Sequence, residues 1–187
     1  EKGYQGAQHS IIDLDVGAKD LQQCADATIR LWAEYLFKRK RYRDIHFNFL
    51  SDLKPRYFSK FADGNFTYDT FRKYLEWVFT YANTASLFHE LKTVSREELK
   101  PGDIFIQKGQ PFGHAVIVVD IAIHKSTGKK IFLLAQSFMP AQEIHVLKNP
   151  ANPVLSPLYS VDYGDSLVTP EYHFKPSKGY KIKRFGS

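Results

Sequence analysis

Residues 114–123, His-Ala-Val-Ile-Val-Val-Asp-Ile-Ala-Ile, form an apolar run rich in β-branched side chains. Such a run is typical of a buried β-strand. Three similar runs lie on either side of it, at 104–107, 130–136 and 143–147, and residues 126–129 have the composition of a hairpin turn. The second half of the chain is therefore predicted to form an antiparallel meander.

The first half of the chain has helical periodicity instead. Apolar or small residues recur at helical spacing over 21–36, and Asp20 with Gln23 three positions later has the form of a capping box. A second helix is predicted from Tyr68 to about Ala82, and a shorter one through 87–91. Helices followed by an antiparallel meander are the α+β pattern, and residues 1–187 are expected to form a single domain.

The two ends of the chain have weaker signals. Residues 11–16, Ile-Ile-Asp-Leu-Asp-Val, alternate as a half-buried strand does. After Asn149 the chain contains five prolines, so it is expected to wrap the surface with few regular elements.

Composition excludes several classes of function. The net charge of +6 is concentrated in a basic run at 38–43, which suits the negative end of the preceding helix, so no nucleic-acid partner is expected. No apolar run is long enough for a transmembrane segment. Phosphate-binding motifs are absent, and Asp13 and Asp15 share one face of the predicted strand as solvated residues do, so neither a cofactor nor a metal is expected. The oligomeric state is not indicated by any feature.

Cys24 is the only cysteine, and it lies near the start of the first predicted helix. A helix N-terminus and a neighbouring histidine together stabilise a thiolate, which is the reactive form of cysteine. His114, at the start of a predicted strand, is the candidate partner. The alternative is that Cys24 is a packed, inert thiol and that His114 binds a loop carbonyl.

Two segments carry a resemblance to a known group of enzymes. Leu-Lys-Pro-Gly-Asp-Ile-Phe-Ile at 99–106 and Gly-His-Ala-Val-Ile-Val at 113–118 resemble the signature of papain-like cell-wall hydrolases of the NlpC and CHAP types. The resemblance implies a papain-like fold, in which a cysteine at a helix start packs on an antiparallel sheet. It implies Cys24 as the nucleophile, His114 as the general base and Gln136 as the group that orients the histidine, with Ser137 as the alternative for the third role.

A broader resemblance covers the chain from Ile11 to Phe174. Segments at 12–36, 72–87, 113–120, 133–150 and 167–174 are similar to an uncharacterised family of bacterial exported proteins. The resemblance implies an extracytoplasmic location in the cell envelope, and it implies segments missing from this chain near 6/7 and 64/65, where members of that family are longer.

The expected function is that of a cysteine amidohydrolase or peptidase acting on an amide bond, with a peptide or a peptidoglycan-like molecule as substrate. Gln22 and Gln23 are candidate donors to an oxyanion, Ser137 is a further substrate contact, and Trp77 is a candidate for the wall of a binding groove. The sequence around Cys24 departs from the Asp-Cys-Ser-Gly of the hydrolases, since Asp26 places a carboxylate two residues from the thiol. The alternative is therefore an inactive papain-like envelope protein that binds a glycan, peptide or protein partner.

Overall fold

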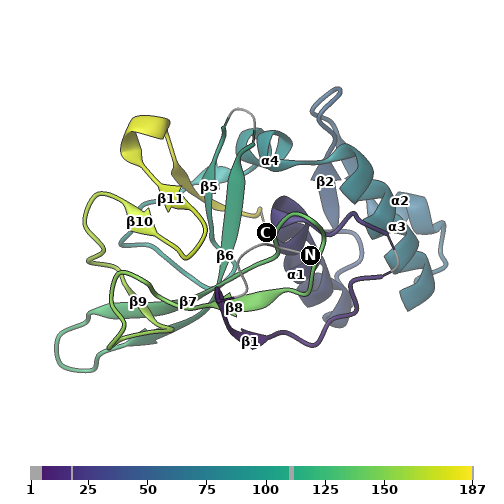
Figure 1. Cartoon of the computed structure of the whole chain (residues 1–187). Helices are drawn as coiled ribbons and strands as arrows, with labels where there is room; N and C mark the ends of the chain where they lie inside the picture. The colour runs from purple at the N-terminus through teal and green to yellow at the C-terminus, as the bar shows by residue number, and fades with distance from the viewer. Residues whose placement is uncertain (1–5, 18, 110–111, 187) are drawn as a thin grey trace.

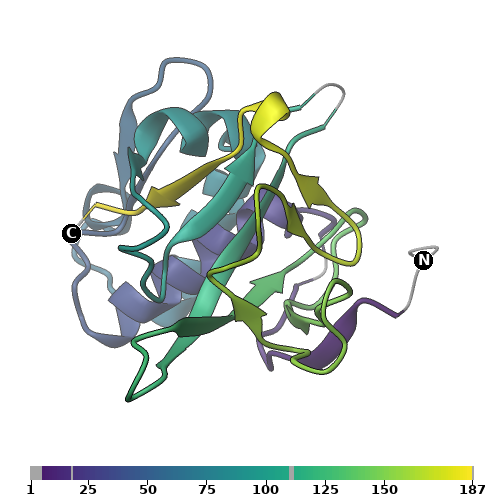
Figure 2. The ribbon, with the colours of Figure 1, turned by 90° about the vertical axis from the view of Figure 1, so that its left-hand side faces the viewer.

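A large antiparallel sheet separates two layers of the molecule (Figures 1 and 2). The structure is a computed structural model that describes residues 6–17, 19–109 and 112–186. The helices lie on one side of the sheet, and the short strands near the C-terminus lie on the other. No helix in these residues is long and apolar enough to cross a membrane.

The helical elements come mainly from the first half of the chain: α1 (Cys24–Lys38), α2 (Phe58–Ala62), α3 (Tyr68–Tyr81), α4 (Thr84–Glu90) and a 3-10 turn at Pro176–Lys178. The strands are β1 (Gln8–Ile11), β2 (His46–Asn48), β3 (Pro55–Tyr57), β4 (Lys92–Thr93), β5 (Ile104–Gln107), β6 (His114–Ile123), β7 (Lys130–Gln136), β8 (His145–Leu147), β9 (Tyr159–Ser160), β10 (Leu167–Val168), β11 (His173–Phe174) and β12 (Lys181–Arg184).

The predicted meander is confirmed. Strands β5, β6 and β7 have the predicted bounds, and β5 to β8 pair antiparallel in chain order. The α+β class is confirmed with it. The main sheet runs β1-β8-β7-β6-β5-β12-β4, and β9 pairs with β7.

Strand β6 contributes to a core on each face of the sheet. Ala115 and Ile117 pack with the helices, whereas Val116 and Val118 pack with the C-terminal segments. Because side chains alternate along a strand, two apolar layers require the unbroken apolar run seen in the sequence. Strand β7 follows the same rule, with Ala135 on the helical side and Leu134 on the other.

The strand predicted at 11–16 is wrong in its bounds. Strand β1 ends at Ile11, and the backbone N–H of Leu14 turns back to the carbonyl of Ile12 at 2.8 Å. Ile12 and Leu14 pack against the helical core from this loop. The alternation therefore comes from a loop that buries one of its sides, and not from a strand.

The C-terminal region is more regular than predicted. Strand β12 lies inside the main sheet, between β5 and β4. Arg184 in this strand makes two hydrogen bonds to the carboxylate of Asp103, at 2.7 and 2.8 Å, and Asp103 is buried. The same carboxylate accepts the backbone N–H of Lys100 at 2.8 Å. The Pro-Gly-Asp turn and the last strand therefore hold each other in place.

We predict that Arg184→Met lowers the free energy of unfolding by about 3–5 kcal/mol, because it leaves a buried carboxylate without its cation. Chemical denaturation measures the change. The matched control is Lys129→Met, which breaks an exposed ion pair with Asp162 (3.3 Å) and is expected to cost less than about 1 kcal/mol. Equal losses in the two variants would contradict the assignment of Asp103 and Arg184 as an anchor.

Candidate functional site

Helix α1 begins at Cys24, with Gln23 as its N-cap. The carboxylate of Asp26 turns back and accepts the backbone N–H of Gln23 at 3.0 Å, which satisfies one of the unpaired donors of a helix start. The predicted cap at Asp20 is wrong, because its carboxylate accepts the backbone N–H of Ala141 at 2.6 Å instead. The helix therefore begins three residues later than predicted.

The thiol of Cys24 lies between the helical layer and the start of β6. Burial raises its pKa most, and the charge of Asp26 raises it further. Hydrogen bonds from the backbone N–H groups of Ala25 and Ala115 and from the Thr84 hydroxyl act in the opposite direction. Because the net shift is upward, the sulfur is held as a neutral thiol and needs a base before it can act as a nucleophile.

Three side chains form a hydrogen-bonded chain that begins at the first residue of β6. The ring Nε2 of His114 lies 2.8 Å from Oε1 of Gln136, and Nε2 of Gln136 donates to Glu171 at 2.7 Å. A carboxylate only accepts, so it fixes which end of the amide faces the histidine. The amide oxygen likewise only accepts, so the proton of a neutral imidazole lies on Nε2 and the basic nitrogen is Nδ1.

Aromatic rings enclose His114. Its ring centroid lies 4.9 Å from that of Tyr172 and 5.4 Å from that of Phe138. The hydroxyl of Tyr172 accepts a hydrogen bond from Gln107 at 2.9 Å. Burial raises the pKa of Tyr172, and the charge of Cys24 contributes to the same rise. Tyr172 is thus close both to the imidazole and to the thiol.

The candidate residues lie around the start of β6, on its two faces. By strand alternation His114 shares a face with Val116 and Val118, on the side of the C-terminal segments, whereas Cys24 comes from the helical side and contacts the backbone of Ala115. The structure therefore joins His114 directly to Gln136, and it brings the thiol to the residue next to His114 in the chain.

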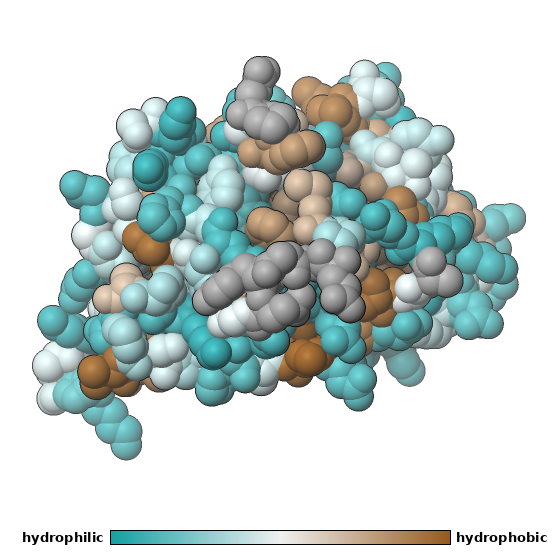
Figure 3. Space-filling view, viewed as in Figure 1, coloured by the Kyte–Doolittle hydropathy of each residue, from teal (hydrophilic) through white to brown (hydrophobic). Residues whose placement is uncertain are grey.

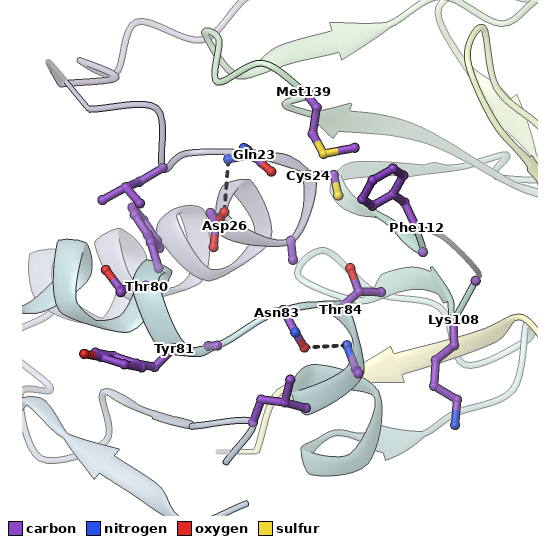
Figure 4. Close-up of a pocket in the computed structure, with 18 of the residues that line it drawn as sticks. Gln23, Cys24, Asp26, Thr80, Tyr81, Asn83, Thr84, Lys108, Phe112 and Met139 are labelled. Atoms are coloured by element: carbon purple, nitrogen blue, oxygen red, sulfur yellow. Dashed lines mark hydrogen bonds between the residues drawn. The ribbon is translucent and has the colours of Figure 1, made fainter.

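A cavity of about 710 Å³ opens beside Cys24 (Figure 4). Its volume is in the range of small-molecule sites, about 300–1,000 Å³. Figure 4 shows the sulfur of Cys24 between the side chains of Met139 and Phe112, with Thr84 below it. The lining comes from residues 20–21, 23–26, 50–51, 79–85, 108–109, 112–113 and Met139.

The remaining candidates are divided between the cavity and the core. Gln23 lines the cavity. Gln22 is buried, and its Oε1 accepts a hydrogen bond from the buried Arg30 at 3.2 Å. The hydroxyl of Ser137 donates to the carbonyl of Gln22 at 2.8 Å, on the helical side of the sheet. Trp77 packs between Phe49 and Phe61, outside the cavity lining.

Sequence reasoning did not single out Glu171, Tyr172 or Thr84. Glu171 and Tyr172 lie in the Leu-Val-Thr-Pro-Glu-Tyr-His-Phe segment that belongs to the broader resemblance, but neither periodicity nor spacing assigns them a position. Thr84 begins α4 directly after its cap, Asn83. Among the described residues no group of three His, Cys, Asp or Glu side chains has the arrangement of a metal site.

Comparison with known proteins places the chain in a family. The model of one protein family matches residues 1–66 and 56–181, and that family is described as Domain of unknown function (4846). The chain belongs to this family. The description carries no activity, and neither a curated protein nor a solved structure matches the chain. The expected membership of an uncharacterised family is confirmed.

Asp26 provides a test of the electrostatics around the thiol. Burial raises the pKa of its carboxyl from 3.8 to about 7. Between these two pH values the folded state holds a proton that the unfolded chain has released, so the free energy of unfolding falls as pH rises. At about 1.4 kcal/mol per unit, the full effect is up to roughly 4 kcal/mol.

We predict that Asp26→Asn removes this dependence, so that the variant gains stability over the parent protein between pH 4 and pH 8. The pKa of Cys24 also falls in the variant, because a charge that opposes the thiolate is gone. Denaturation at several pH values measures the first effect, and the pH dependence of Cys24 alkylation measures the second. Burial also raises the pKa of Glu90 to about 7. Glu90 is present in both proteins, so its contribution to the pH dependence cancels in the difference. Parallel stability curves would refute the prediction.

Proposed function

We propose that this protein is a cysteine hydrolase that cleaves an amide bond through an acyl-enzyme intermediate. The observation that carries the proposal is the 2.8 Å hydrogen bond between His114 and Gln136 at the start of β6, where the Cys24 thiol contacts Ala115. The bond leaves Nδ1 of a neutral His114 as the basic nitrogen, which is what a neutral thiol requires.

The proposed reaction has two steps. Nδ1 of His114 takes the thiol proton, the sulfur of Cys24 attacks the carbonyl carbon, and the carbon–nitrogen bond breaks as the imidazolium returns the proton to the leaving amine. Water then attacks the thioester with His114 again as the base, which releases the acid and restores the thiol. Gln23 is the candidate oxyanion donor because it lines the cavity beside the sulfur.

The proposed substrate is a peptide or a peptidoglycan-like molecule, and the proposed place of action is the extracytoplasmic cell envelope. Both come from the resemblance of the Pro-Gly-Asp and Gly-His-Ala-Val segments to papain-like hydrolases of the NlpC and CHAP types. The order of cysteine, histidine and orienting residue along the chain agrees with that resemblance. Cell-wall peptides are therefore the first substrates to test.

We predict that His114→Ala slows alkylation of Cys24 at pH 7 about tenfold or more, since general-base assistance contributes at least that much in related chemistry. Amide hydrolysis over a panel of peptides, followed by mass spectrometry, is expected to be lost in Cys24→Ala and in His114→Ala. The matched control is His173→Ala, which replaces an exposed histidine. An unchanged alkylation rate in His114→Ala would exclude the proposed pair.

Glu171 is a positioning residue in this proposal, because it acts on His114 through its hydrogen bond with Gln136. We predict that Glu171→Leu lets the Gln136 amide turn over, which slows hydrolysis about tenfold, while Glu171→Gln keeps an acceptor oxygen and most of the rate. The ¹⁵N shifts of His114 report the tautomer, and only Glu171→Leu is expected to reduce the Nε2–H form. Unaltered shifts in Glu171→Leu would contradict the role.

A binding protein without catalysis is the second candidate. One observation favours it: burial and the charge of Asp26 raise the pKa of the Cys24 thiol, which disfavours the reactive thiolate. In that case the cavity binds a glycan, peptide or protein partner, and Cys24→Ala retains both the binding and the biological effect.

A further inference from the structure

The cavity beside Cys24 has an apolar mouth formed by three segments that are distant in the sequence. Leu50 is 46% exposed, Tyr81 is 51% exposed and Phe112 is 64% exposed. Figure 3 shows hydrophobic side chains gathered in a hollow between the tip of the β2–β3 hairpin and the loop before β6. Large apolar side chains that remain exposed together around a cavity are characteristic of ligand sites.

Part of this mouth is held in place by the fold. The backbone N–H of Leu50 donates to the carbonyl of Tyr81 at 2.9 Å, which fixes the hairpin against the end of α3. The ring of Tyr81 stacks on Phe49, with the centroids 5.0 Å apart. The backbone at Leu50 and the ring of Tyr81 are therefore preorganised, so less ordering entropy is lost when a ligand covers them.

Several polar side chains of the lining already make hydrogen bonds to the protein's own backbone. Asp20 accepts from Ala141, as described above. The oxygen of Asn83 accepts the N–H of Ala85 at 2.9 Å, and the hydroxyl of Thr80 donates to the carbonyl of Glu76 at 2.9 Å. These groups are consequently poor partners for a charged ligand.

The charged side chains of the described lining disfavour an anionic ligand. Figure 4 shows Lys108 directed away from Cys24, and its Nζ lies 4.7 Å from the centre of the Phe88 ring. Asp26 is the acid whose charge acts on the thiol, and its Oδ1 is buried without a hydrogen-bond partner in the described part of the chain. A carboxylate or phosphate would therefore meet an acid and no facing cation, whereas an uncharged group meets apolar walls.

We propose that the cavity binds an uncharged substrate through a bulky apolar group, which Leu50, Tyr81, Phe112 and Met139 contact while a carbonyl carbon of the substrate lies at Cys24. This inference rests on the proposed hydrolase function and narrows its substrate class. The apolar group can be the side chain of a large hydrophobic amino acid or a fatty acyl chain, since both offer the same uncharged surface.

Alkylation of Cys24 tests the inference without a known substrate, because the chain has a single cysteine. The probes are iodoacetamide, N-benzyl iodoacetamide, N-octyl iodoacetamide and iodoacetate. In each case the sulfur–carbon bond forms, the carbon–iodine bond breaks, iodide leaves and the thiol proton passes to the base or the buffer. Each second-order rate constant is divided by that of the same chain unfolded in guanidinium, which removes intrinsic probe reactivity.

We expect the normalised rate of an apolar probe to exceed that of iodoacetamide about tenfold, because burying a phenyl or octyl group contributes at least that factor. Iodoacetate is expected to be the slowest. A preference for the benzyl probe indicates an amino-acid side chain, and a preference for the octyl probe indicates an acyl chain. Phe112→Ala and Leu50→Ala are expected to reduce the preference about threefold or more, and both replace exposed side chains, so the fold is preserved.

The matched control is Val154→Ala, which removes an apolar side chain that is 98% exposed and outside the cavity lining. A second measurement separates this inference from the hydrolase proposal: binding of unreactive N-benzylacetamide and N-octylacetamide to Cys24→Ala, followed by NMR shifts. Binding that Phe112→Ala weakens supports the apolar site even where amide hydrolysis is absent. Equal normalised rates for the neutral probes, a preference for iodoacetate, or no binding of either amide would overturn the inference.

Discussion

The contact between the first turn of α1 and the first residues of β6 determines where every candidate group lies. Small residues of the helix, among them Ala25 and Ala33, belong to the same core as Ala115 and Ile117 of the strand, so helix and sheet can approach closely. The sulfur of Cys24 consequently reaches the backbone N–H of Ala115. A larger side chain at these positions would move the helix start away from the strand, and the thiol with it.

Much of the fold could be predicted from local patterns because the first half of β6, residues 114–118, is buried on both faces. A doubly buried strand needs a continuous apolar run, and such a run is visible in one sequence. Strand β12 could not be predicted in the same way. Its sequence, Lys-Ile-Lys-Arg, is mostly cationic, and it is stabilised by partners distant in the chain: Lys183 donates to the carbonyl of Leu91 at 3.0 Å, and Arg184 pairs with Asp103. The prediction of Asp20 as the helix cap is wrong for a related reason. The carboxylate of Asp20 accepts a hydrogen bond from the backbone N–H of Ala141, which is 121 residues away.

The candidate site also has residues that could be predicted from the sequence and residues that could not. Resemblance names Gln136 as the partner of His114 and leaves Ser137 as the alternative. The structure joins Gln136 to His114, because residues 114 and 136 lie on one face of neighbouring strands and residue 137 lies on the other. Glu171 and Tyr172 lie between the two-residue strands β10 and β11, which have no periodicity to detect. Their positions depend on how the proline-rich C-terminal segment crosses the sheet, and only the assembled fold supplies that information.

Asp26 connects the start of the helix to the chemistry of the cavity. Its carboxylate caps α1 through Gln23, yet the same negative charge opposes a thiolate at Cys24. Because burial raises the pKa of Asp26 to about 7, a large share of the molecules hold it uncharged near neutral pH, and the repulsion is correspondingly weak. The resting cavity then contains a neutral thiol, an acid that is only partly ionised, and apolar walls. Beside the largely buried thiol, charge that forms on a substrate carbonyl is stabilised mainly by fixed donors rather than by water. A low resting charge thus suits an uncharged ligand, and it makes the few backbone and hydroxyl donors around Cys24 the decisive groups for any reaction there.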